Sequence, residues 1–311
     1  MELAITKPEN VQATRLVTDH RFIDSNTQVV TLPQLKDGCI IPAFSKDNEP
    51  SISHTEFVES VWEAVQDAFC SEEVLRPSIR VSHAIRGRIP DARFKAAKDL
   101  LECEKTLYYE RMMFLIEVPS VYRIINGQHI NLSIGGVRSY HQENLNSKRS
   151  LQKFKVFIGF RNRVCCNLCV STDGYLDSLK ASSSNEIYSK SKELFLGYEA
   201  AEMLSEFSLW GQQRLSKDEF ARFLGYCRLL NHMPLSETKQ HSPIAFTDHQ
   251  MNQVTSGYYY DKHFSRSNDG SIDLWKVYNL LTGANKSSYI DKYLERIVNA
   301  VTATRHLSAH L

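Results

Sequence analysis

The chain has 311 residues, of which 42% are hydrophobic and 10% aromatic, and its formal net charge is +1. This composition supports a sizeable hydrophobic core, and it excludes both a disordered chain and a surface that is positively charged throughout. The longest apolar run, at 112–116, is too short to span a membrane, and the first ten residues lack the apolar segment of a signal peptide. We therefore expect a soluble, cytoplasmic protein without a membrane partner.

The chain begins with polar sequence that contains several prolines. Residues 1–50 alternate polar stretches with short apolar pieces, which indicates an irregular N-terminal arm with one edge strand. Segment 54–69 then repeats apolar residues at helical spacing with glutamates on the opposite side, which predicts an acidic amphipathic helix. From residue 47 to residue 73 there are eight acids and no Lys or Arg.

Short apolar runs between residues 79 and 140 predict the strands of a sheet. Asn126-Gly127 is the dipeptide of a two-residue hairpin turn, and Gly135-Gly136 is expected to end or bulge its strand. A basic turn is expected at 86–90, followed by helix or loop as far as residue 109. The strand candidates are 79–85, 112–118, 121–125 and 128–134, with 137–140 as a continuation.

Segment 153–171, KFKVFIGFRNRVCCNLCVS, is predicted to be a strand pair with two different faces. One face is basic and polar and also contains Phe157. The other face is apolar and is predicted to continue through a turn near Arg161 and Asn162 into the second strand. Its members are Phe154, Val156, Ile158 and Phe160, then Val164, Cys166, Leu168 and Val170.

Three of the seven cysteines, Cys165, Cys166 and Cys169, fall in this segment. On a strand that rises about 3.3 Å per residue, Cys165 and Cys169 stand about 13 Å apart, and Cys166 points to the opposite face. An odd number of irregularly spaced cysteines is typical of free thiols in a reducing compartment. We therefore expect structural cysteines, no metal site and no cofactor.

The second half of the chain is predicted to be helical. One helix is expected from about 185 to 206, and Ser216 with Glu219 forms the capping box of the next. Two final helices are expected at 272–281 and 288–301, and no strand is expected after residue 171. Trp275, Tyr278, Asn279 and Thr282 share one face of the first of these helices, as core residues do.

These elements predict an α+β fold with a mainly antiparallel sheet in the first half and a helical second half. The expected parts are an irregular arm at 1–50, a sheet-containing part with the acidic helix at 51–184, and a helical part at 185–311. We expect the helical part to pack on the sheet, so that 51–311 forms one unit.

Two basic blocks indicate a polyanionic partner. Segment 76–98 contains seven bases and one acid, and segment 148–163 contains six bases and no acid. Bases beside an aromatic ring on an open sheet face can bind single-stranded nucleic acid, although an ordinary solvated face, or one covered by the acidic helix, has the same pattern. We expect a non-enzymatic protein that binds nucleic acid, with single-stranded DNA favoured. The expected contact residues are Arg86, Arg88, Lys153, Lys155, Phe157, Arg161 and Arg163.

Four longer blocks of the sequence carry a family resemblance. They are RGRIPDARFKAAKDLLECEKTLYYERM, INLSIGGVRSY, FKVFIGFRNRVCCNLCVSTDG and LWKVYNLLTGANKSSYID. Over residues 76–300 the chain resembles an uncharacterised domain-of-unknown-function family of gut-dwelling anaerobic bacteria. The LWxxYNxxT element at 274–282 is also similar to the phage/plasmid-like protein family. The resemblance implies a mobile element or prophage as the context and supplies no activity.

Two other functions stay open. The acidic helix at 54–69, or the final helices, would bind another protein of the same mobile element. An enzyme acting on DNA or a nucleotide would need Glu110 and further acids to hold Mg²⁺. A carboxylate of Glu110 paired with a neighbouring arginine would instead be structural.

Overall fold

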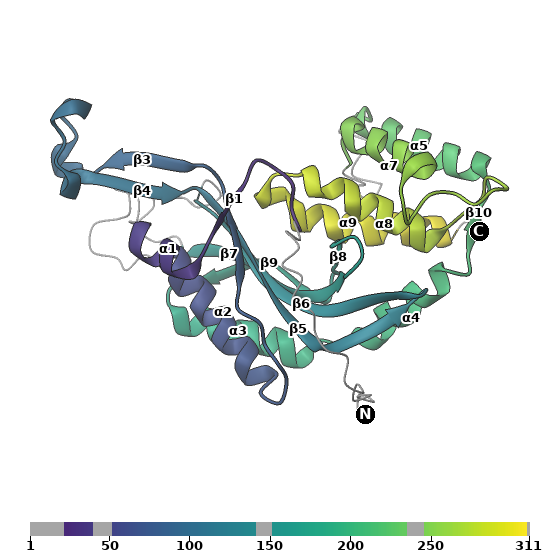
Figure 1. Ribbon diagram of the computed structural model, residues 1–311, viewed down its shortest axis with the longest axis horizontal. Coiled ribbons are helices and arrows are strands. Elements are labelled where there is room, and N and C mark those ends of the chain that lie inside the picture. The colour runs from purple at the N-terminus through teal and green to yellow at the C-terminus, as the bar shows by residue number, and fades with distance from the viewer. Residues whose placement is uncertain (1–21, 40–51, 141–150, 235–245, 310–311) are drawn as a thin grey trace.

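An antiparallel sheet of seven strands forms the centre of the protein in the computed structural model, which describes residues 22–39, 52–140, 151–234 and 246–309 (Figure 1). In sheet order the strands are β1 (Gln28–Val30), β2 (Ser78–Val81), β5 (Arg111–Ile125), β6 (Gln128–Ser139), β7 (Gln152–Asn162) and β8 (Leu168–Cys169), and β9 (Tyr175–Ala181) also pairs with β7. Helices dominate the chain after β9. The fold is α+β, as predicted.

Helices cover the sheet on both faces. Figure 1 shows α2 and α3 on one side of the sheet and α8 and α9 on the other. The helices are α1 (Leu32–Gly38), α2 (His54–Ala68), α3 (Ser184–Gly197), α4 (Ala200–Trp210), α5 (Lys217–Asn231), α7 (Asp248–Tyr260), α8 (Leu274–Ala284) and α9 (Ile290–Ser308). Short strands β10 (Arg214–Leu215) and β11 (Ile272–Asp273) pair beside α8. In the part of the chain that the structure describes, no helix is both long and apolar enough to cross a membrane.

The acidic helix α2 has the predicted amphipathic packing. Its apolar side is buried against the sheet, where the Phe57 ring lies 5.2 Å from that of Phe114 and 4.7 Å from that of Phe154. Ser53 caps the helix in a reciprocal bond with Glu56. The capping box predicted from Ser216 and Glu219 likewise starts α5.

The N-terminal region contains the predicted edge strand, which is β1. It also contains α1, a helix that the proline content argued against. Thr31 and Gln34 form a capping box there, and Pro33 lies in the first turn, where a missing amide hydrogen costs nothing. The rest of the predicted irregular arm, 1–21 and 40–50, lies outside the described residues.

The hairpin at Asn126-Gly127 is confirmed, with φ values of 49° and 77° at the two residues. The break expected at Gly135-Gly136 is wrong, because β6 runs through both. A Cβ on Gly135 would lie 2.9 Å from the Phe157 ring, and one on Gly136 would lie 2.5 Å from the Phe57 ring. The two glycines therefore make room for aromatic rings on opposite faces of a continuous strand.

Segment 153–171 follows its predicted alternation only in the first strand. The apolar series of β7 packs in the core on the α2 side, as expected. Leu168 and Val170, predicted to continue that series, pack instead on the α9 side. Cys166 has a φ of 59°, and the irregular turn around it shifts the side-chain phase by one residue. The sheet also continues beyond residue 171, since β9 pairs with β7.

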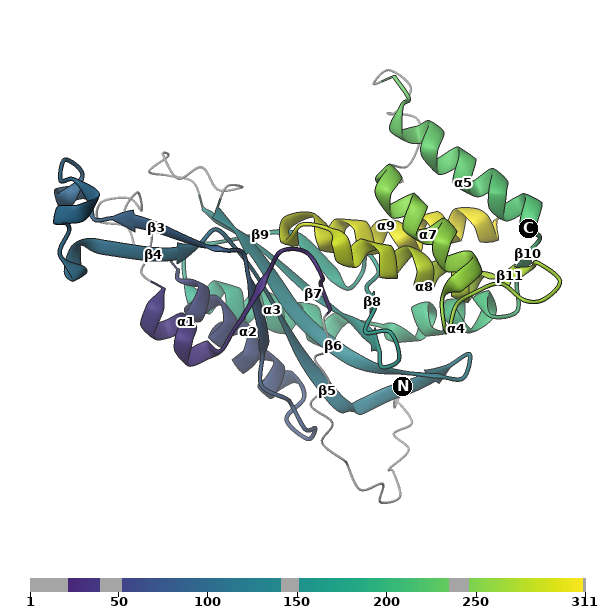
Figure 2. The ribbon, with the colours of Figure 1, turned by 45° about the horizontal axis from the view of Figure 1, so that its top comes forward.

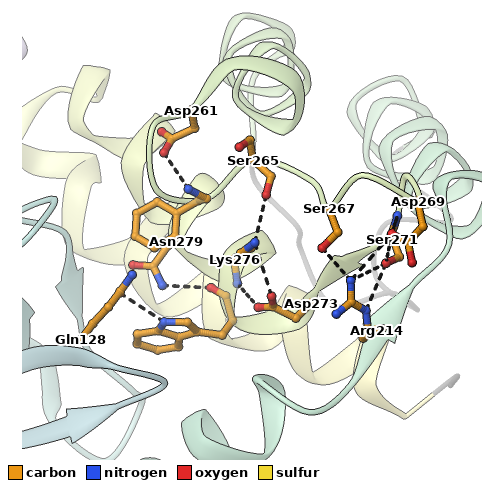
Figure 3. A network of polar contacts seen from close by, with 12 residues as sticks. Gln128, Arg214, Asp261, Ser265, Ser267, Asp269, Ser271, Asp273, Lys276 and Asn279 are labelled. Atoms are coloured by element: carbon orange, nitrogen blue, oxygen red, sulfur yellow. Dashed lines mark hydrogen bonds and ion pairs between the residues drawn. The ribbon is translucent and has the colours of Figure 1, made fainter.

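Helix α8 is buried almost all round, which explains the Trp-Tyr-Asn element that it contains. Trp275 Nε1 donates to Gln128 Oε1 at 3.2 Å, and Asn279 Nδ2 donates to Trp275 O at 2.9 Å (Figure 3). Asn167 Nδ2 donates to Asn279 O at 2.8 Å, so the helix is bonded to the turn that follows β7. Trp275, Tyr278, Asn279 and Thr282 are core residues, as their spacing indicates.

Replacing Phe157 tests the packing of α9 on the sheet. Phe157 has no exposed surface and lies in a core cluster with Tyr293 and Ile297 of α9. We expect Phe157→Ala to lower the free energy of unfolding by about 3–5 kcal/mol in chemical denaturation, because the ring leaves a cavity. The control is Phe94→Ala, which removes the same ring from a position that is 86% exposed and should change stability by about 0.5 kcal/mol or less. Equal effects would contradict this packing.

Candidate nucleic-acid interface

A two-stranded ribbon projects from the sheet between β2 and β5 (Figures 1 and 2). It consists of β3 (Ala84–Arg88) and β4 (Lys105–Tyr109), which pair antiparallel, and the chain between them forms short 3₁₀ turns at the tip. We call residues 84–109 the β-arm. The basic turn predicted at 86–90 is wrong, because residues 86–88 belong to β3. The helix or loop predicted up to 109 is correct as far as residue 104 and wrong beyond it, where β4 begins.

Three cations lie on one face of the β-arm. Arg86 and Arg88 alternate along β3, and Lys105 is directly opposite Arg88 on β4. Like charges at directly opposed positions destabilise a ribbon, by about 0.2–1 kcal/mol on the scale of cross-strand pairs. Glu102 forms an ion pair with Lys105, whereas Arg86 is exposed and has no ion pair with any described residue. Arg88 also donates to the backbone oxygen of Lys95, so Arg86 is the cation of this face that is most available to an anion.

The tip of the β-arm folds over this face and encloses a groove of about 720 Å³. Its lining includes all three cations and Glu102, the partner of Lys105, together with Leu100 and Leu107. The groove thus combines positive charge with apolar surface, the two features that hold the backbone and the bases of a nucleic acid.

An exposed aromatic ring lies at the tip. Phe94 is 86% exposed, and the Arg93 guanidinium carbon lies 4.6 Å from the centroid of its ring. Leu101 is also exposed. Lys95 is paired with Glu104, so the tip itself is held by an ion pair while the ring points to solvent. Sequence analysis missed Phe94, although its place in Arg93-Phe94-Lys95, an aromatic between two bases, is a usable signal.

Buried polar groups anchor the base of the β-arm. His54 Nε2 donates to the backbone oxygen of Tyr109 at 2.7 Å. Burial, together with the nearby charge of Arg138, lowers the pKa of His54 to about 3, so the ring is neutral. Arg138 is 1% exposed and lies 4.5 Å from the ring centroid of Tyr140, which in turn packs against His54. These contacts fix the point from which the ribbon leaves the sheet.

The predicted contact residues of β7 do not form an open face. Phe157 is buried beneath α9, so its ring is not available to a base. Lys155 is half-buried, and its Nζ lies 3.0 Å from Asp177 Oδ1. Arg161 is 7% exposed and paired with Glu117. The basic face of β7 is therefore covered, and the covering helix is α9. The acidic helix α2 lies on the opposite face of the sheet.

Lys153 and Arg163 remain exposed but lie at opposite ends of β7. Ten residues of strand separate them by about 33 Å. Lys153 is directly opposite Lys180 of β9, and Arg163 lies in the turn after β7. Among the seven predicted residues, Arg86 and Arg88 lie together on the β-arm, the element whose tip also carries the exposed Phe94 ring.

The acids and cysteines do not form a metal site in the described residues, where no three His, Cys, Asp or Glu side chains are arranged to hold an ion. Glu110 lies 3.6 Å from Arg111, which is the structural pairing considered for it. Burial raises the pKa of the Cys165 thiol to about 11 and that of Cys169 further. Both side chains are therefore neutral thiols in the core.

The protein is thus an α+β protein in which a sheet covered by helices on both faces carries a projecting, basic β-arm. Over residues 7–309 the chain matches the family model described as "Domain of unknown function, B. Theta Gene description (DUF3871)". Because the match extends over nearly the whole chain, the protein belongs to this family. No curated protein and no solved structure matches the chain.

The buried histidine at the base of the β-arm predicts a pH dependence of stability. The pKa of His54 falls from 6.5 to about 3 on folding, so between these values the unfolded chain binds a proton that the folded protein excludes. The free energy of unfolding should therefore decrease as the pH falls through this window, by up to about 1.4 kcal/mol per pH unit from this group.

Urea denaturation at a series of pH values measures this effect. His54→Gln keeps a donor for Tyr109 O but does not titrate, so its stability should fall less steeply than that of the wild type. His83→Gln, at an exposed position, should keep the wild-type slope. Identical slopes for the wild type and His54→Gln would show that His54 is not held neutral.

Proposed function

We propose that the protein binds nucleic acid without catalysing a reaction, that single-stranded DNA is its preferred ligand, and that the β-arm makes the contact. The observation that carries the proposal is the cationic face of the ribbon. Arg86, Arg88 and Lys105 lie together on an element that protrudes into solvent, and two of them are directly opposed across the ladder. Phosphate groups would neutralise these cations and release counterions, which is the main source of non-specific affinity.

Phe94 supports a preference for single strands. In a duplex the faces of the bases are already stacked, whereas in a single strand they are accessible to an aromatic side chain. Its ring is almost fully exposed, next to a guanidinium group that would accompany a phosphate. Because Phe157 of β7 is buried, a base would stack on Phe94 at the tip and not on β7.

We further propose that the protein acts in a mobile element of the phage or plasmid type. The support is the similarity of the element at 274–282 to the phage/plasmid-like family. In the structure this element is the buried helix α8.

A protein partner is the second candidate, and the exposed side of α2 favours it. Glu56, Glu59 and Glu63 face solvent there, opposite the buried apolar residues of the helix. A basic surface on another protein of the same element would complement these charges. Pull-down of a defined partner that is lost in Glu59→Lys/Glu63→Lys, with DNA binding intact, would support this candidate.

Charge reversal on the β-arm tests the phosphate contacts. Arg86→Glu/Arg88→Glu should weaken binding of a fluorescein-labelled oligo(dT) at least about tenfold and lower the slope of log affinity against log salt by about 1.4, because two contacts are lost. Fluorescence anisotropy at several salt concentrations measures both. The matched control is Arg222→Glu/Arg228→Glu, an equal charge change at exposed positions of α5. Equal losses in the two variants would show that only net charge matters.

Removal of the ring at the tip tests base stacking. Phe94→Ala should weaken oligo(dT) binding about 5- to 150-fold, the value of one stacked base, and leave duplex binding nearly unchanged. Competition between labelled single-stranded and duplex DNA measures the preference. Leu101→Ala removes exposed apolar surface from the same tip without removing a ring and serves as the control. An unchanged preference in Phe94→Ala would contradict the stacking role.

A further inference from the structure

Two exposed tyrosines end helix α7, at the far end of the molecule from the β-arm (Figures 1 and 2). Tyr260 is 83% exposed and Tyr259 43%. Their ring centroids lie 6.0 Å apart. Neither sequence motifs nor the proposed contact on the β-arm accounts for two large rings in solvent at this position.

The position of Tyr259 is fixed by its contact with the buried Tyr258. The Tyr258 ring packs edge-on against it at 4.8 Å and stacks on Phe220 at 4.7 Å. Tyr258 is buried, and its hydroxyl donates to the backbone oxygen of Gly270 at 2.5 Å. The exposed ring therefore rests on a rigid base, so a ligand that stacks on it pays little ordering entropy.

The loop after α7 adds two cations near the rings, and its two carboxylates bind groups within the loop. Arg266 N donates to Tyr258 O at 2.9 Å, and the Arg266 guanidinium carbon lies 5.4 Å from the Tyr259 centroid. Lys262 is exposed on the same loop. The Asp261 carboxylate accepts two backbone amides of the loop, and Asp269 accepts from Ser271 beside Arg214 (Figure 3). Neither Lys262 nor Arg266 forms an ion pair with a described residue, so both charges can contact a ligand.

We infer that Tyr259, Tyr260, Lys262 and Arg266 form a second surface for single-stranded nucleic acid, which we call the tyrosine platform. Rings in solvent next to cations are the combination on which the bases and phosphates of a single strand bind, without regard to sequence. The platform takes its ligand class from the proposed function but lies apart from the β-arm. A strand long enough to reach both surfaces binds more tightly than a short one, because the second contact is intramolecular.

The experiment titrates the full chain with a short and a long fluorescein-labelled oligo(dT), followed by anisotropy. Tyr259→Ala/Tyr260→Ala should lose at least about fivefold in affinity for the long strand and most of the advantage of the long strand over the short one. Tyr259→Phe/Tyr260→Phe keeps both rings and should retain the wild-type affinity. Near-UV and far-UV circular dichroism checks that each variant is folded.

The outcomes separate this inference from the proposed function. A loss in the alanine variant, with retention in the phenylalanine variant, supports the tyrosine platform, even if the β-arm variants bind normally. Wild-type affinity in the alanine variant, with weakened β-arm variants, overturns the platform and leaves the β-arm contact in place. Capture of a protein partner by the tyrosines, with DNA affinity unchanged, would also overturn it.

Discussion

Burial of the central sheet on both faces is the constraint on which the rest of the structure depends. The Phe57 ring of α2 packs on Gly136 from one side, and the Phe157 ring, beneath α9, packs over Gly135 from the other. A Cβ at either glycine would collide with a ring, so β6 passes between two aromatic layers. Since α9 packs on the face that carries the basic series of β7, Phe157 is buried there and Lys155 and Arg161 are held in ion pairs.

Because helices cover both faces of the sheet, we expect contacts with other macromolecules at the periphery of the protein. The β-arm and the tyrosine platform lie at opposite ends of the molecule, and each combines exposed rings with cations. Exposed rings contribute nothing to the folded core, and an arginine opposite a lysine opposes the pairing of its ribbon. Features such as these, which do not stabilise the fold, are expected at functional sites. The Trp-Tyr-Asn helix α8, by contrast, is buried almost all round and packs in the core.

Sequence reasoning identified the elements whose signals are local. The α2 helix follows from its apolar spacing, the capping box at Ser216 follows from three-residue spacing, and Asn126-Gly127 fixes its own hairpin. The errors come from tertiary contacts. Gly135-Gly136 suggests a break in the strand, but the strand continues because the two glycines make room for rings that are distant in sequence. Cys166 adopts a left-handed backbone conformation, which reverses the facing of the residues that follow it. Of the candidate site, the charges at Arg86 and Arg88 were predictable from the sequence. That the basic face of β7 is covered was not, because the covering helix, α9, lies more than a hundred residues further along the chain.

The proposed contact with nucleic acid is made by the β-arm and not by the β7 face. Ultraviolet cross-linking of the full chain to a single strand carrying 5-iododeoxyuridine, followed by mass spectrometry of the peptides, tests it directly. Cross-links are expected within residues 84–109, strongest at Phe94, and none is expected at Phe157, which has no exposed surface. Cross-links on residues 153–163 without any on the β-arm would contradict it.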